Sequence, residues 1–125
     1  MKTIIATLLV LCFCGLSANT VSAQTINKKS LLSDLNNSDG MTMDSKQKSS
    51  YESINSNTAN SLLEMDKKNL SKDDRDKEVD KIFDKRDSDV DKLWGKDSIY
   101  EDTRKTYKKK TRSLRLKIKA AKLVM

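Results

Sequence analysis

Apolar residues recur at steps of three and four along most of this chain, the spacing that places side chains on one face of an α-helix. A first long helix is predicted over residues 44–69, with a face formed by Tyr51, Ile54, Thr58, Leu62, Met65 and Asn69. A second helix over 71–95 has a face formed by Val79, Ile82, Phe83, Arg86, Val90, Leu93 and Trp94. A third, starting near Asp97 or Ser98, has a stripe formed by Tyr100, Thr103, Tyr107, Thr111, Leu114, Ile118, Ala121 and Met125.

Capping residues mark the starts of the first two helices. Asp44 can accept a bond from the backbone of Gln47, whose side chain can return one, the reciprocal arrangement of a capping box. Ser71 followed by Asp74 repeats this spacing, and Gly95 ends the second helix. Short connections between the helices favour antiparallel neighbours. We therefore predict an all-α fold, a long antiparallel helical hairpin with a third basic helix, more open than a compact bundle.

The first 23 residues read as a secretory signal. Lys2 is followed by an apolar stretch and then by Val21-Ser22-Ala23, a small-residue cleavage site, so we expect cleavage after Ala23. The apolar stretch is shorter than the roughly 20 residues that a membrane-spanning helix needs.

Residues 24–42 are polar and end in a cluster of turn formers, Asn36-Asn37-Ser38-Asp39-Gly40. We expect this segment to be a flexible arm. Leu31, Leu32 and Leu35 could form one short amphipathic turn within it.

The amino-acid composition argues against enzymes and metal-binding proteins. The chain has no His and no Pro, and both of its cysteines, Cys12 and Cys14, lie in the expected signal segment. The remainder lacks the residues that most metal sites and many nucleophilic catalysts use, so we predict no enzyme activity, no cofactor and no metal. Large apolar residues are few, which predicts a thin core and favours either marginal stability or a dimer.

The net charge of +7 is concentrated in the third helix, which has no acid after Asp102. Its cations are Arg104, Lys105, Lys108, Lys109, Lys110, Arg112, Arg115, Lys117, Lys119 and Lys122. Such a field attracts acidic proteins, anionic lipid or nucleic acid, whereas a solvated helix face is the simpler interpretation. Few aromatic side chains accompany these cations, which disfavours stacking on bases and therefore nucleic acid.

Met43-Asp44-Ser45-Lys46-Gln47 resembles the Leu-Thr-x-x-Gln motif of the Spy/CpxP group of periplasmic helical proteins, with Met in place of Leu and Asp in place of Thr. Residues 69–75 and 86–93 are also similar to that group. Of a second copy of the motif, at 93–97, only Leu93 is kept. The resemblance covers about residues 43–110.

The resemblance implies a Spy-like helical domain over residues 43–125, forming an open, cradle-like homodimer in the periplasm of a Gram-negative bacterium. It also implies an ATP-independent chaperone or envelope-stress adaptor that binds unfolded or partly folded proteins. Candidate contacts on this chain are Arg104, Lys105, Lys108, Lys109, Lys110, Arg112, Arg115, Met43 and Met65, and the capping motif consists of Met43, Asp44, Gln47, Ser71 and Asp74.

Three alternatives stay open at this point. The methionines, which are adaptable contacts, could equally be core or arm residues. Trp94 and Phe83 either pack the hairpin against the third helix or face clients. Finally, the protein could be a non-enzymatic accessory that docks one fixed partner or an anionic membrane surface through its basic C-terminal helix.

Overall fold

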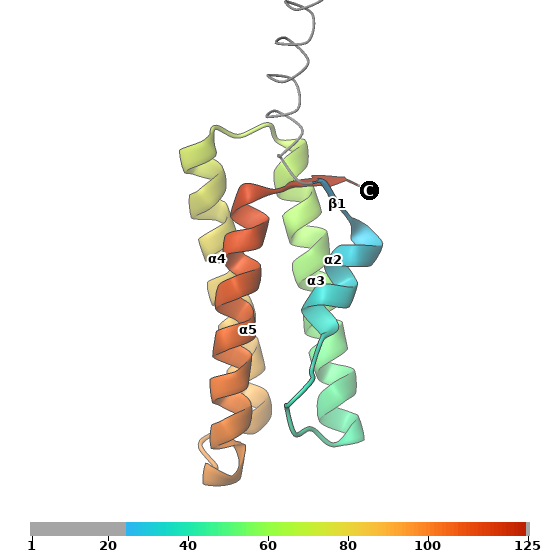
Figure 1. The fold of residues 1–125 in the computed structure, drawn as a ribbon, viewed down its shortest axis with the longest axis vertical. Coiled ribbons are helices and arrows are strands. Elements are labelled where there is room, and N and C mark those ends of the chain that lie inside the picture. The colour runs from blue at the N-terminus through green and yellow to red at the C-terminus, as the bar shows by residue number, and fades with distance from the viewer. Residues whose placement is uncertain (1–24, 125) are drawn as a thin grey trace, which may run out of the picture.

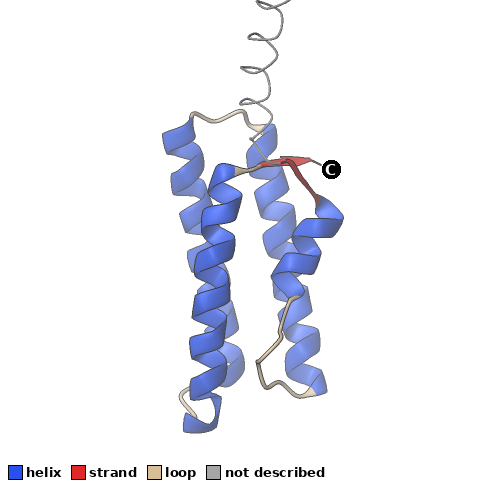
Figure 2. Ribbon diagram, in the orientation of Figure 1, coloured by secondary structure: helices blue, strands red, loops and turns tan. Residues whose placement is uncertain are grey.

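The computed structural model describes residues 25–124 as an elongated four-helix unit closed at one end by a pair of short strands (Figures 1 and 2). Its elements are β1 (Thr25–Asn27), α2 (Lys28–Asn36), α3 (Ser45–Lys67), α4 (Lys72–Trp94), the 3-10 helix η1 (Ser98–Tyr100), α5 (Glu101–Ala120) and β2 (Lys122–Val124). The all-α class and the three long helices are as predicted. The expected signal segment, residues 1–23, lies outside the described residues.

The predicted caps form at both starts. Asp44 Oδ1 accepts from the Gln47 amide at 2.7 Å, and Gln47 Oε1 accepts from the Asp44 amide at 3.0 Å, completing a capping box. Ser71 Oγ accepts from the Asp74 amide at 3.3 Å, but no bond returns from the Asp74 side chain within residues 25–124. Gly95 ends α4 with φ of 59°, a backbone angle that glycine adopts at little cost.

The expected flexible arm is instead part of the packed structure. Its residues 25–36 form β1 and α2, and α2 lies against α3. Leu31 and Leu35 are completely buried, and Asn27 caps α2 by accepting from the Ser30 amide at 2.8 Å. The prediction of a flexible arm was wrong for residues 25–36. The short amphipathic turn considered around Leu31, Leu32 and Leu35 forms there as α2, because these leucines pack against α3.

The third helix is shorter than predicted, and a small sheet follows it. Helix α5 ends at Ala120, and β2 then pairs in parallel with β1, with Ile26 opposite Leu123. At the end of a helix the last backbone carbonyls have no partner within the helix. The Arg75 guanidinium donates hydrogen bonds to carbonyls there, to Ile118 O at 2.9 Å and to Ala121 O at 2.7 Å. This small sheet was not predicted from the sequence, because its two strands come from opposite ends of the described chain.

The core consists of two apolar clusters. The larger includes Leu31, Leu62, Phe83 and Ile118, and the smaller is built on Tyr51, Val90, Trp94 and Tyr107. Buried polar residues lie between the two clusters along the helices: Asn55 on α3, Arg86 on α4 and Thr111 on α5. The bundle therefore has a polar layer across its middle.

The predicted hairpin with a third basic helix is present, and α2 adds a fourth helix to it. Helix α5 lies along α4, and α2 covers α3 on the same side of the molecule (Figure 1). Phe83 and Trp94 are buried, which supports their packing role, and the Trp94 ring meets Tyr107 edge-on at a centroid distance of 5.6 Å. No helix within residues 25–124 is long and apolar enough to cross a membrane.

Candidate functional site

Helix α5 concentrates the positive charge of the described chain. It carries nine basic and two acidic side chains, whereas α4 beside it carries seven basic and nine acidic ones. Its buried face, formed by Thr103, Tyr107, Thr111, Leu114 and Ile118, follows the predicted stripe. The cations therefore lie on its flanks and on its outer side.

The cations on the flank of α5 that faces α4 are neutralised by acids of that helix. Arg115 reaches Asp80, Asp84 and Asp87 at 3.1–3.4 Å, and its guanidinium lies 5.4 Å from the centre of the Phe83 ring. Lys119 pairs with Asp80 at 2.7 Å. Arg115 is one of the predicted contact residues, and acids of α4 balance its charge within the bundle.

The outer cations are different. Lys108, Lys109 and Arg112 are exposed, and within residues 25–124 no acceptor or acidic partner is found for their side chains. Among the other predicted cations, Arg104 donates to Gly95 O and Asp97 O at 2.9 Å, and Lys105 pairs with Glu101 at 3.1 Å. The outer surface of α5 thus carries charge that the bundle itself does not balance.

One large apolar side chain interrupts this basic surface. Leu116 is 63% exposed, and only Ile99 is comparable among the described residues. Because Lys109, Arg112 and Leu116 follow one another at steps of three and four, they share a face of α5. We call Lys108, Lys109, Arg112 and Leu116 the outer face of α5.

The predicted methionine contacts lie elsewhere. Met65 is only 2% exposed and belongs to the larger apolar cluster, so it is a core residue. Met43 is half-buried and packs against the smaller cluster. Neither methionine is close in sequence to the exposed cations of α5. Neither forms an exposed apolar patch. The capping motif is likewise structural, since Gln47 Nε2 also donates to Leu93 O at 3.0 Å.

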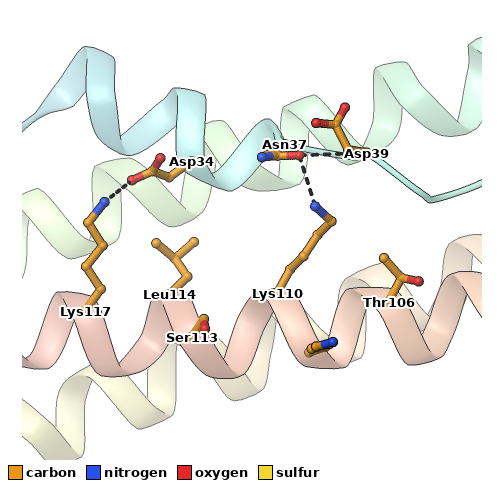
Figure 3. A pocket seen from close by; sticks show the side chains of 9 residues that line it. Asp34, Asn37, Asp39, Thr106, Lys110, Ser113, Leu114 and Lys117 are labelled. Atoms are coloured by element: carbon orange, nitrogen blue, oxygen red, sulfur yellow. Dashed lines mark hydrogen bonds and ion pairs between the residues drawn. The ribbon is translucent and has the colours of Figure 1, made fainter.

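A groove runs between α5 and the α2 segment (Figure 3). It has a volume of about 680 Å³ and is lined by Asp34, Asn37, Asp39, Thr106, Lys109, Lys110, Ser113, Leu114 and Lys117. Two bridges cross it: Lys117 Nζ donates to Asp34 Oδ2 at 2.9 Å, and Lys110 Nζ donates to Asn37 Oδ1 at 3.1 Å. Leu114 stands between the two bridges and provides an apolar floor.

Arg86 is the residue whose role the sequence did not reveal, although its position on an apolar stripe was a signal. It is 3% exposed, and no carboxylate lies within ion-pair distance of it in the described chain. Its guanidinium donates to Asn55 Oδ1 at 2.7 Å, Thr111 Oγ1 at 3.0 Å and Leu35 O at 3.1 Å. Arg86 therefore joins all four helices.

Aromatic rings complete the surroundings of Arg86. The guanidinium carbon lies 5.0–5.9 Å from the ring centres of Tyr51, Phe83 and Tyr107, within the range of cation–π attraction. Burial raises the pKa of Tyr107 well above its usual value, and the phenol donates to Asp87 Oδ1 at 2.6 Å. This centre is enclosed by side chains, so it holds the bundle together and leaves α5's surface as the candidate site.

Among residues 25–124, no group of three or more acids could hold a metal ion. The cations of α5 can bind anions by charge and by hydrogen bonding.

Comparison of the chain with known protein families, with curated proteins and with solved structures finds no match.

Proposed function

We propose that this protein is a non-enzymatic docking module that binds an acidic protein surface through α5. The observation that carries the proposal is the outer face of α5, where Lys108, Lys109 and Arg112 have no acidic partner within residues 25–124. Repulsion among them opposes folding, and an acidic partner relieves it. Exposed Leu116 adds an apolar contact at the same place.

Two further observations favour a protein partner. The aromatic side chain that α5 contributes, Tyr107, is buried and so is not available to stack on nucleic-acid bases. A membrane surface would be held more firmly by several inserted apolar residues than by Leu116 alone.

Binding to poly-L-glutamate at low salt tests the proposal. We expect binding that weakens steeply as salt rises, because exposed charges are screened over about 8 Å at physiological ionic strength. Replacing Lys108, Lys109 and Arg112 by Gln removes up to about 1 kcal/mol per cation and should weaken binding about tenfold or more.

The matched control removes three exposed lysines from α3 and its end, Lys46, Lys48 and Lys68, again by Gln. Both variants lose the same charge. An equal effect of the two, or no binding of the unmodified protein, contradicts the proposal. Binding to vesicles of anionic lipid but not to poly-L-glutamate would point to the membrane instead.

The chaperone implied by the sequence resemblance is a second candidate and makes a different prediction. Such a protein accepts unrelated unfolded clients, which requires accessible apolar spots. Because Met65 is in the core and Met43 is half-buried, the described surface offers few of them. Light scattering from an aggregating, chemically unfolded test protein distinguishes the two: a docking module leaves it unchanged, and a chaperone suppresses it without ATP.

A further inference from the structure

The groove between α2 and α5 has features of a recognition site that the outer face lacks. Lys110 and Lys117 already point across it, because each donates to an acceptor on the opposite wall (Figure 3). A lysine ammonium has three N–H donors, and Lys110 and Lys117 each use one of them in these bonds. Both therefore keep donors for a ligand while their long side chains are held in place.

Holding a side chain in its bound position lowers the entropy lost on binding. Lys117 is fixed by an ion pair to Asp34, whose side chain is 36% exposed, so both groups stay open to solvent. Leu114 lies between the two ammonium groups at the bottom of the groove. Along α5 the groove thus has a cation, a leucine of which only 9% is exposed, and a second cation in a row.

The spacing of this row defines what would fit. Lys110 and Lys117 are seven residues apart on one helix, or about 10 Å along its axis, with Leu114 between them. A second helix lying along the groove has the same rise per residue. An acid at its position i, an apolar residue at i+3 or i+4 and an acid at i+7 would lie on one face of it and match the row.

We infer that the partner lays an acidic amphipathic helix over this groove, with two carboxylates on Lys110 and Lys117 and an apolar side chain toward the exposed edge of Leu114. This goes beyond the proposed function by adding a second contact surface on α5, beside the outer face, and it rests on that function. Helices laid into grooves by such spaced anchors are a recurring mode of recognition. Asp34 and Asp39 on the opposite wall disfavour a uniformly acidic strand and so favour a helix with its acids on one side.

A designed peptide tests the inference on the full protein. The probe is a fluorescein-labelled, alanine-rich peptide of about 18 residues, long enough to form a helix. It carries Glu, Leu and Glu at i, i+4 and i+7. In the control peptide one Glu is moved by two residues, which keeps the net charge but puts the acids on different faces. A third peptide replaces Leu by Ser.

Fluorescence anisotropy at low salt should show the matched peptide binding about fivefold or more tightly than the shifted one, because two charge-assisted contacts act together. The Ser peptide should bind about threefold or more weakly, since it lacks the apolar contact. On the protein, Lys110→Gln with Lys117→Gln should remove this preference. Lys108→Gln with Arg112→Gln, which loses the same charge, should keep it.

The possible outcomes test the groove assignment and the proposed docking function separately. Equal binding of the matched and shifted peptides, with equal effects of the two double variants, overturns the groove assignment and leaves charge-driven docking standing. Failure of every peptide and of poly-L-glutamate to bind overturns both. Circular dichroism of the groove variant shows whether it stays folded, as we expect because Leu31 and Leu35 still anchor α2.

Discussion

Arg86 is a buried cation that is satisfied without a carboxylate. Its hydrogen bonds go to neutral oxygens on three other helices, and three aromatic rings surround it. One acceptor, Leu35 O, belongs to the last turn of α2, where the helix dipole is negative and favours a positive charge. Asn55 Nδ2 donates to the same oxygen at 2.9 Å. These contacts fix the position of the C-terminal end of α2 relative to α3 and α4.

Replacing Arg86 by Ala should be severely destabilising. The change leaves Asn55 Oδ1 and Thr111 without their donor and opens a cavity among the rings, so we expect the free energy of unfolding to fall by about 3 kcal/mol or more. Urea denaturation followed by circular dichroism measures it. Arg112→Ala, an exposed change on α5, is the control and should cost about 0.5 kcal/mol or less. Equal losses would mean that Arg86 is not the link between helices.

Tyr107 makes stability sensitive to alkaline pH. Burial, and the hydrogen bond to Asp87, raise the pKa of Tyr107 in the folded state above its unfolded value of about 10. The folded state therefore retains a proton that the unfolded state loses. The contribution of Tyr107 to stability is fully present below pH of about 10 and is lost as pH rises further. Tyr107→Phe should remove this part of the fall. Denaturation of both proteins at pH 8 and pH 11 tests it, and identical slopes would contradict the assignment.

At the scale of elements, the clasp between Arg75 and Asp66 fixes the end of α5. The guanidinium binds the carboxylate through two N–H groups, at 2.6 and 3.1 Å, while it also donates to the last carbonyls of α5. Asp66 Oδ2 accepts from the Leu123 amide at 2.7 Å. One ion pair at the α3–α4 connection thus holds both the last turn of α5 and β2.

Asp66→Asn tests the clasp. Asparagine keeps the shape but loses the charge, so we expect a loss of about 1–3 kcal/mol, the range for a hydrogen bond to a charged group. Hydrogen exchange should speed up at Leu123 and at the end of α5 and stay unchanged at the start of α3. Glu64→Gln, which removes the exposed pair with Lys67, is the matched control. Equal protection of Leu123 in both variants would show that Asp66 does not hold β2.

Local signals in the sequence were enough for α3, α4 and most of α5, because helical spacing, the Asp44 box and Gly95 act over a few residues. They could not reveal β1 and α2. Ile26 pairs with Leu123 almost a hundred residues away, and Leu31 and Leu35 become core residues only once α3 is present. At the candidate site, the basic third helix could be predicted from the sequence. Which of its cations the bundle neutralises depends on Asp80, Asp84 and Asp87 of α4, and that required the structure.

At the scale of the whole molecule, the N-terminal segment completes the bundle. Without β1 and α2, one side of α3 and the apolar cluster around Leu62 would be open to water. The groove would also lose the wall that holds Lys110 and Lys117 in position. The segment thus links stability and the proposed site.

Deleting residues 24–36 should therefore do more than shorten the protein. We expect loss of the cooperative thermal transition and binding of hydrophobic dyes, because Leu31 and Leu35 alone contribute roughly 3–6 kcal/mol of burial. Leu31→Ala with Leu35→Ala is the milder variant and should weaken the transition without removing it. Calorimetry measures both. A deletion variant that unfolds at the temperature of the full chain would show the segment to be dispensable.

The parallel pairing of β1 with β2 also has a consequence for the order in which the molecule assembles. Thr25–Asn27 pairs with Lys122–Val124, so the first and last described segments become neighbours. Closing so long a loop is entropically costly, and contacts between distant parts of a chain form slowly compared with local helices. During synthesis the first strand has no partner until the last one has been made. β1 can therefore pair with β2 only after all the residues between them have been made, and the four helices must pack together before the two strands can meet.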